Sequence, residues 1–258
     1  MTPVEWALGI LAGFAAGILS GLFGVGGGIV TTPAVNVLLG GTAIQAVATP
    51  LPVIFPTSLV GAYTYAKAGE ASFRAARWAV GPGLAGAALG AYLTEFTDAH
   101  LLLLATAVLL AWTALQVIRG RRTATPWRVG ATPGWRYAAI GLGAGLVSGL
   151  LGVGGGIVMV PAFTVLLGMP LKRALGTSLV VISALVVPGT IVHAWLGNID
   201  WAIFLALTIG VIPGARIGAL VAIGARERTL RMTVGLFLLV IGVVYGISET
   251  VALLGNGG

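Results

Sequence analysis

The chain alternates between long apolar runs and short polar turns, and this pattern predicts its elements. Eight runs are 17–24 residues long, close to the roughly 20 residues that carry a helix across a bilayer. Two runs of 13 residues would extend only about 20 Å as helices. We therefore predict an all-α fold of eight long helices and two short ones. The ten runs cover residues 4–23, 28–40, 44–66, 75–94, 99–118, 136–152, 156–168, 173–196, 201–223 and 230–253.

Composition places these helices in a membrane. Hydrophobic residues make up 58% of the 258 residues, only 8% are charged, and the mean hydropathy is +1.05. Such a chain has too little polar surface to coat a soluble globule. It contains no cysteine, which excludes disulfides, a thiol nucleophile and a thiolate metal site. The sequence therefore predicts an all-α integral membrane protein.

One apolar segment occurs twice. The heptapeptide Gly-Val-Gly-Gly-Gly-Ile-Val of residues 24–30 returns unchanged at residues 152–158. Residues 16–40 and 144–168 share 18 identities in 25 aligned positions. Similarity at this level indicates a tandem duplication with five runs in each repeat. We divide the chain into a first transmembrane repeat (1–120), a basic linker (121–135) and a second transmembrane repeat (136–258).

The net charge of +7 reflects basic residues in the turns and reports on topology. If all ten runs cross, 13 of the 14 Lys and Arg residues share one face, and the opposite turns carry Glu95, Asp98 and Asp200. If the two short runs dip in and return, Lys172 and Arg173 move outside, together with the basic residues at 226–231. We prefer the first scheme, a multi-pass protein of the cell inner membrane with residues 119–136 cytoplasmic and both termini outside. An odd number of crossings then inverts one repeat relative to the other.

Three consecutive glycines precede each short run. Glycine permits positive φ and close approach to a ligand, and a helix that starts there offers free N–H groups to an anion. Two such helix starts from inverted repeats would face one central site. The alternative is tight packing alone, as expected for the pairs Gly86/Gly90 and Gly214/Gly218. Three glycines in a row exceed what packing requires, and no strand precedes them as a nucleotide fingerprint would need. The predicted substrate-binding glycines are Gly26, Gly27, Gly28, Gly154, Gly155 and Gly156.

Deep within the predicted spans the sequence places one arginine, Arg216, and no Asp or Glu. An isolated charge there costs at least about 2.5 kcal/mol, so we expect Arg216 to contact the substrate. The alternative is a structural arginine bonded to carbonyls or extended toward the cytoplasm. His193 lies near the outer end of its helix. It is either an interfacial histidine or a proton-linked gate.

Hydroxyl groups recur at equivalent positions of the two repeats. Thr49 and Thr177 are equivalent, Ser178 follows the second of them, and Ser20 and Ser148 each precede a glycine turn by four residues. Helical hydroxyls often bond the carbonyl four residues back rather than a ligand. Because of the duplication we include Thr49, Thr177 and Ser178 among the expected substrate-binding residues.

The doubled pattern Gly-x-Gly-Gly-Gly-x-x-x-x-Pro, from Gly24 to Pro33 and from Gly152 to Pro161, resembles the TauE/SafE family of sulfite exporters. The runs at 174–178 and 213–219 add to a resemblance that spans residues 5–250. It implies a bacterial or archaeal inner-membrane permease that moves sulfite, sulfoacetate or similar anions, usually outward. The first repeat departs from the second by carrying Pro50 after Thr49, so the halves are expected to contribute unequally.

The resemblance implies an exporter of sulfite, organosulfonates or related small sulfur-containing anions, and we expect it to work by alternating access. N–H donors and one arginine suit an oxyanion, and the lack of intramembrane carboxylates argues against a proton relay. The alternatives are an anion channel, or an importer of a small organic anion coupled to protons or sodium. We expect no enzymatic activity, cofactor, metal or nucleic-acid partner; the anion and the lipid bilayer are the partners, and the protein is a monomer or homodimer.

Overall fold

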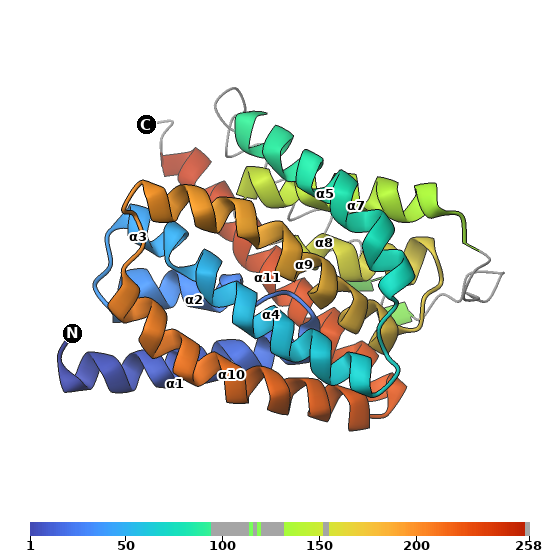
Figure 1. Ribbon diagram of the computed structural model, residues 1–258, viewed down its shortest axis with the longest axis horizontal. Helices are drawn as coiled ribbons and strands as arrows, with labels where there is room; N and C mark the ends of the chain where they lie inside the picture. The colour runs from blue at the N-terminus through green and yellow to red at the C-terminus, as the bar shows by residue number, and fades with distance from the viewer. Residues whose placement is uncertain (94–113, 116–117, 120–131, 152–154, 256–258) are drawn as a thin grey trace.

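The computed structural model describes residues 1–93, 114–115, 118–119, 132–151 and 155–255, and every regular element in these ranges is helical (Figure 1). The long helices are α1 (Pro3–Phe23), α4 (Pro50–Lys67), α5 (Phe73–Leu93), α7 (Gly134–Leu151), α9 (Leu171–Trp195), α10 (Trp201–Gly224) and α11 (Glu227–Gly255). The short elements are α2 (Gly28–Pro33), α3 (Ala43–Ala48) and α8 (Gly156–Pro161), with the π-helical turns η1 (Ala34–Leu38) and η3 (Ala162–Leu166). The predicted all-α class is confirmed for these residues.

Several of these helices have the length and composition of membrane spans. The candidates among the described residues are Pro3–Phe23, Ile44–Lys67, Leu171–Trp195 and Trp201–Gly224. Because α2 continues into η1 and α8 into η3, the chain also forms two shorter apolar helices, Gly28–Leu38 and Gly156–Leu166. These are the two short helices that the sequence predicts. The predicted run 99–118 lies mostly outside the described residues, so the count of eight long crossings stays a prediction.

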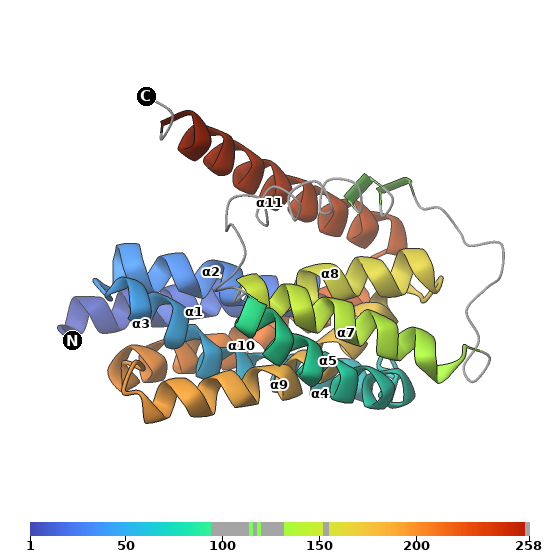
Figure 2. The same cartoon turned by 90° about the horizontal axis from the view of Figure 1, so that it is seen from above.

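Helices of the two repeats are interleaved. In the described structure α1 packs along α10, α5 along α7, and α4 along α9, while Figure 2 shows α11 along one side of this bundle. Glycines permit the close packing: a Cβ on Gly17 of α1 would lie 2.5 Å from the carbonyl oxygen of Val211 in α10. The pairs Gly86/Gly90 and Gly214/Gly218 also face the backbone of a neighbouring helix at less than 3 Å from where a Cβ would stand. The packing interpretation of those two pairs is confirmed.

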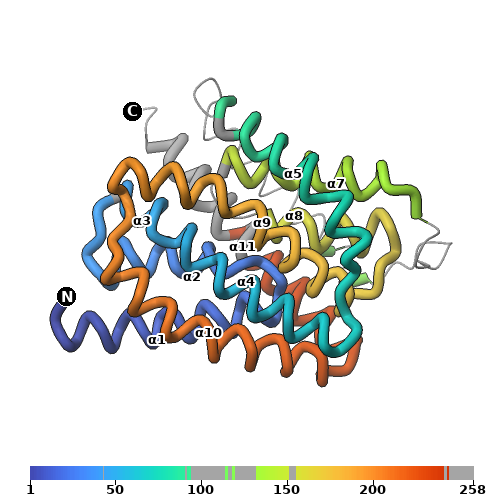
Figure 3. Tube along the Cα trace, viewed as in Figure 1, coloured from blue at the N-terminus to red at the C-terminus, as the bar shows by residue number. Residues whose placement is uncertain are grey.

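Equivalent helices of the two repeats run in opposite directions. In Figure 1, α1 runs from left to right and its counterpart α7 from right to left. The tube view in Figure 3 shows the same reversal between α4 and its counterpart α9. The two pairs α1/α7 and α4/α9 are therefore inverted, and of these α4 and α9 are in contact.

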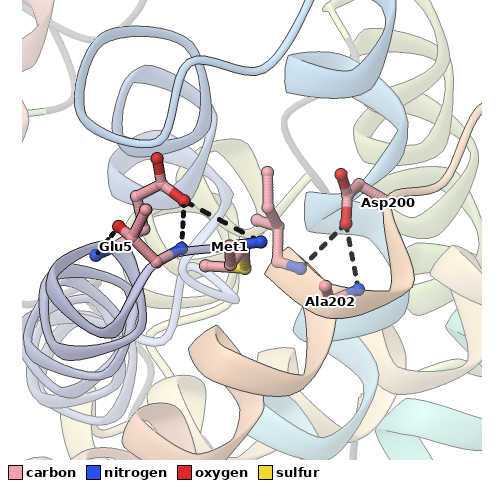
Figure 4. Close-up of polar contacts among 6 residues, drawn as sticks. Met1, Glu5, Asp200 and Ala202 are labelled. Carbon is pink, nitrogen blue, oxygen red and sulfur yellow. Dashed lines mark hydrogen bonds and ion pairs between the residues drawn. The ribbon is translucent and has the colours of Figure 1, made fainter.

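One end of the bundle carries acidic helix starts. In Figure 4, Glu5 and Asp200 lie at the starts of the neighbouring helices α1 and α10. The Glu5 carboxylate accepts a hydrogen bond from the N–H of Thr2 at 2.7 Å. Asp200 Oδ1 accepts from the N–H groups of Ala202 and Ile203 at 2.9 and 3.0 Å. Both carboxylates thus cap the positive ends of helix dipoles.

The opposite end of the bundle collects basic residues. At the start of α9, Lys172 Nζ donates a hydrogen bond to the carbonyl oxygen of Ile223, near the end of α10. The neighbouring Arg173 donates to the carbonyl oxygen of Gly69 at 2.9 Å and lies 3.9 Å from the Glu70 carboxylate. The α9 start therefore lies beside the turn between α4 and α5. A topology that separates these segments on opposite faces is incompatible with these contacts.

Candidate anion site at the glycine turns

The chain reverses at the end of α1 through glycines with left-handed backbone. Gly24 has φ +68° and ends α1, with its N–H donating to the carbonyl oxygen of Ser20 at 2.8 Å. Gly26 and Gly27 follow with φ +83° and +86°, and α2 begins at Gly28. Side chains are disfavoured in this region. The sequence therefore requires glycine here for conformation as well as for space.

The second turn lies against the first. Gly155 has φ +72° and precedes the start of α8 at Gly156, while Gly154 lies outside the described residues. A Cβ on Gly156 would lie 2.6 Å from the carbonyl oxygen of Gly24 and 2.7 Å from Val25 Cα. The two turns thus meet inside the protein, which is the arrangement that a single central site requires.

Helices α4 and α9 enclose this meeting point. A Cβ on Gly26 would lie 3.0 Å from Cγ2 of both Ile54 and Ile182, which occupy equivalent positions in the two repeats. Ser178 Oγ donates to the carbonyl oxygen of Gly24 at 2.9 Å, so the structure brings this predicted residue to the turn. Sequence reasoning missed the two isoleucines, although their equivalence across the duplication was a usable signal.

Hydroxyl-bearing side chains surround the first turn. The position of a Cβ on Gly27 is 3.6 Å from Ser20 Cβ and 3.7 Å from Thr57 Cγ2, and both side chains are buried. Thr31 Oγ1 donates to the carbonyl oxygen of Gly27 at 3.2 Å. The surroundings of Gly27 are therefore more polar than those of Gly26, which are lined by the two isoleucines.

Backbone donors at the first turn are unused. The N–H groups of Val30 and Thr31 both donate to the carbonyl oxygen of Gly27 at 3.1 Å. Among the hydrogen bonds of the described residues, the N–H groups of Gly26, Gly27 and Gly28 donate none. Buried N–H groups are almost always paired, so these three are candidates for binding an acceptor, and their role in substrate binding stays a prediction.

Thr49 and Thr177 lie where a helix of one repeat meets a helix start of the other. The N–H of Asp200 donates to Thr49 Oγ1 at 3.1 Å, and the N–H of Ser72 donates to Thr177 Oγ1 at 3.0 Å. Ser72 and Asp200 are themselves equivalent, so the two bonds form a swapped pair between the repeats. The described contacts give both threonines a role in joining the repeats, and their predicted role in substrate binding stays a prediction.

Arg216 and His193 are not brought to the glycine turns. Arg216 is exposed on α10, as are its neighbours Ile212 and Ile217. This position fits the alternative in which the side chain extends along the helix toward the membrane surface. His193 is half-buried near the end of α9, with Nδ1 3.2 Å from Asn198 Nδ2. Substrate contact by Arg216 and gating by His193 stay predictions.

The chemistry of the site is that of neutral donors. No cluster of His, Cys, Asp or Glu suited to a metal ion occurs in the described part of the chain. The side chains that border the first turn are uncharged, namely Ala16, Ser20, Ile54, Thr57, Leu175, Ser178 and Ile182. Free N–H groups in such a setting favour a small anion through aligned dipoles and hydrogen bonds.

Comparison with known proteins places the chain in a family. Residues 9–245 match the family described as sulfite exporter TauE/SafE. A "Probable membrane transporter protein" of Xylella fastidiosa (strain 9a5c) is 30% identical, with 91% of each chain covered. YunE of Bacillus subtilis, described in the same words, is 27% identical over 90% of this chain and 94% of its own. No solved structure matches the chain significantly. The chain therefore belongs to the sulfite exporter TauE/SafE family, which consists of multi-pass membrane transporters and not of enzymes.

Proposed function

We propose that this protein exports sulfite, organosulfonates or related small sulfur-containing anions across the cell inner membrane by alternating access. The observation that carries the proposal is the meeting of the two glycine turns, where buried N–H groups have no partner among the described residues. Such groups stabilise an oxyanion without a charged side chain. The substrate class follows from the description of the family, sulfite exporter.

The proposed topology has two inverted repeats, residues 1–120 and 136–258, joined by the linker 121–135. It comprises eight long membrane-crossing helices and the two short ones. The opposite directions of equivalent helices and the gathering of basic segments at one end of the bundle support it. The excess of Lys and Arg assigns that end, with residues 119–136, to the cytoplasm and both termini to the outside. The protein acts as a monomer or homodimer.

The direction of transport follows from the membrane potential. An inside-negative potential of 100 mV drives each exported negative charge by about 2.3 kcal/mol. Export of an anion therefore requires no coupled ion, whereas import against this potential does. The proposal places the substrate between the two turns while one repeat moves against the other.

The test is sulfite efflux from proteoliposomes of purified full-length protein at a clamped membrane potential. We expect saturable efflux that accelerates as the interior becomes more negative and that an alkanesulfonate inhibits. Efflux that stays proportional to millimolar sulfite would indicate a channel. Absence of sulfite and sulfonate flux, from protein shown to be folded by its melting transition, would refute the proposed substrate class.

A further inference from the structure

Three arginines at the basic end of the bundle have no acidic partner among the described residues. Arg74 and Arg77 are exposed near the start of α5, and Arg136 is exposed near the start of α7. None of the three forms an ion pair with a described carboxylate. By contrast, Arg173 and Arg231 each lie against a glutamate. The charges of the first three arginines are therefore available to a negatively charged partner.

These arginines lie around one contact between α5 and α7. The two helices pack along each other, and both begin at the end of the bundle where α9 begins (Figure 1). The indole of Trp78 in α5 covers Gly134, the first residue of α7, because a Cβ on Gly134 would lie 2.5 Å from Trp78 Cε2. Arg74 and Arg77 are within about one helical turn of Trp78, and Arg136 is two residues after Gly134. The first repeat and the second therefore contribute to one α5/α7 basic surface, formed by Arg74, Arg77 and Arg136.

Aromatic and apolar groups adjoin the α5/α7 basic surface. Trp78 and Trp135 are 45% and 65% exposed, and the guanidinium of Arg136 lies 5.5 Å from the centre of the Trp135 ring. Exposed tryptophans beside basic residues are typical of the headgroup level of a bilayer. Further along α5, Gly81 and Ala85 are exposed, and nothing lies within 4 Å of the Cβ position of Gly81. Basic, aromatic and apolar parts thus follow one another in the order of a phospholipid, whereas a soluble acidic protein would need the charges alone.

The duplication supplies a comparison at the opposite end of the bundle, where the equivalent helices α10 and α1 pack along each other in the same way. The residues equivalent to Arg74, Arg77, Arg136, Trp78 and Trp135 are Ala202, Leu205, Leu8, Ala206 and Ala7. The helix starts at that end carry Glu5 and Asp200 instead of basic residues. Packing of the helix pair therefore does not require arginine or tryptophan at these positions. Orientation in the membrane favours basic residues at the cytoplasmic end, but it does not require them beside two tryptophans at one helix contact.

We propose that the α5/α7 basic surface binds the phosphate group of an anionic phospholipid from the cytoplasmic leaflet. Guanidinium groups suit this ligand because they donate charge-assisted hydrogen bonds to phosphate oxygens. Trp78 and Trp135 flank the glycerol level, and an acyl chain lies along α5 beside Gly81. Because α5 and α7 belong to different repeats, one bound lipid contacts both. The choice of leaflet rests on the proposed topology, while lipid binding itself does not depend on the proposed transport of sulfur anions.

The test measures lipid binding to purified, delipidated full-length protein in detergent by native mass spectrometry. We expect the wild-type protein to bind phosphatidylglycerol roughly tenfold more tightly than zwitterionic phosphatidylcholine, because the surface carries three unpaired positive charges. Arg74→Gln, Arg77→Gln and Arg136→Gln should each weaken the binding of phosphatidylglycerol about fivefold, the effect expected for one basic residue at a membrane surface. The control Arg228→Gln removes an exposed charge at the start of α11 and should change this affinity less than about twofold.

The melting temperature separates lipid binding from folding. Phosphatidylglycerol should raise the melting temperature of the wild-type protein and of Arg228→Gln, and should raise it less in the three single variants, whose lipid-free melting temperatures stay at the wild-type value because the side chains are exposed. Equal binding of the two lipids, or unchanged affinity in all three single variants, would overturn the proposal. An equal loss in Arg228→Gln would show general charge attraction in place of a site. Displacement of the lipid by soluble glycerol phosphate would show that the surface takes a free phosphate ester, which would also overturn the proposal. Each of these results leaves the transport proposal intact, because none of them depends on sulfite flux.

Discussion

Gly156→Ala tests whether the contact between the two glycine turns is required for transport. A Cβ at this position would lie 2.6 Å from the carbonyl oxygen of Gly24 and 2.7 Å from Cδ1 of Ile182, whereas ordinary contacts begin at 3.4 Å. To remove this clash, the two glycine turns must move apart by about 0.8 Å, the difference between 3.4 and 2.6 Å. Overpacking of this kind costs about 1–3 kcal/mol, and the higher helix propensity of alanine offsets up to about 1 kcal/mol. We therefore expect a net destabilisation of about 1–2 kcal/mol.

Transport should suffer more than stability, because separating the turns moves the donors away from a common ligand. We expect at least a tenfold loss of sulfite flux, as positional errors near 1 Å in a binding site are severe. The melting temperature should fall by a few degrees, about 2–4 °C for each kcal/mol. Gly143→Ala in α7 is the control, because nothing lies within 4 Å of its Cβ position; it should retain flux and melting temperature. Wild-type flux in Gly156→Ala would refute the contact as a functional element.

Four further variants and one control address other parts of the protein. Thr49→Val and Thr177→Val each remove the acceptor of one N–H group at a helix start. Each should lower the free energy of unfolding in chemical denaturation by about 1–2 kcal/mol and leave the affinity for methanesulfonate unchanged. A large loss of affinity would show that these threonines contact the substrate. Gly27→Ala should reduce flux at least tenfold, while Gly69→Ala, which has φ +73° and open surroundings, controls for backbone strain and should keep its flux. Arg216→Gln should change the KM for sulfite less than twofold, since Arg216 is exposed; a tenfold rise would show that the arginine reaches the substrate.

Features repeated along the chain were predictable from sequence. The duplication is visible when the sequence is compared with itself. The two short helices and the glycines of the turns follow from local pattern, because periodicity and positive φ are properties of neighbouring residues. The structure adds that Gly24 ends α1 and that Gly27 precedes α2. The pairs Gly86/Gly90 and Gly214/Gly218 were also interpreted correctly, since small residues four apart form one helix face.

Contacts between distant segments could not be predicted in the same way. Ser178 and Gly24 are 154 residues apart, and no local pattern shows that the hydroxyl of one meets the carbonyl of the other. Thr49 and Thr177 were grouped with the substrate because duplication marked them, yet duplication is equally expected for bonds that hold two repeats together. Ser20 could be singled out from sequence, but only the structure shows that its buried Oγ has no hydrogen-bond partner among the described residues.

The swapped threonine bonds are compatible with the alternating access that we propose. Because equivalent helices run in opposite directions, the bond from Asp200 to Thr49 and the bond from Ser72 to Thr177 join the repeats at opposite ends of the bundle. In the alternating-access cycle that we propose, opening either end would break one such bond and leave its counterpart intact, so the two open states would differ little in this contribution. The basic end adds the contact of Arg173 with Glu70, which has no charged equivalent at Gln45 and Asn198. In the proposed cycle, the duplication makes the two open states nearly equal in energy, and the charged contact favours the state in which the basic end is closed.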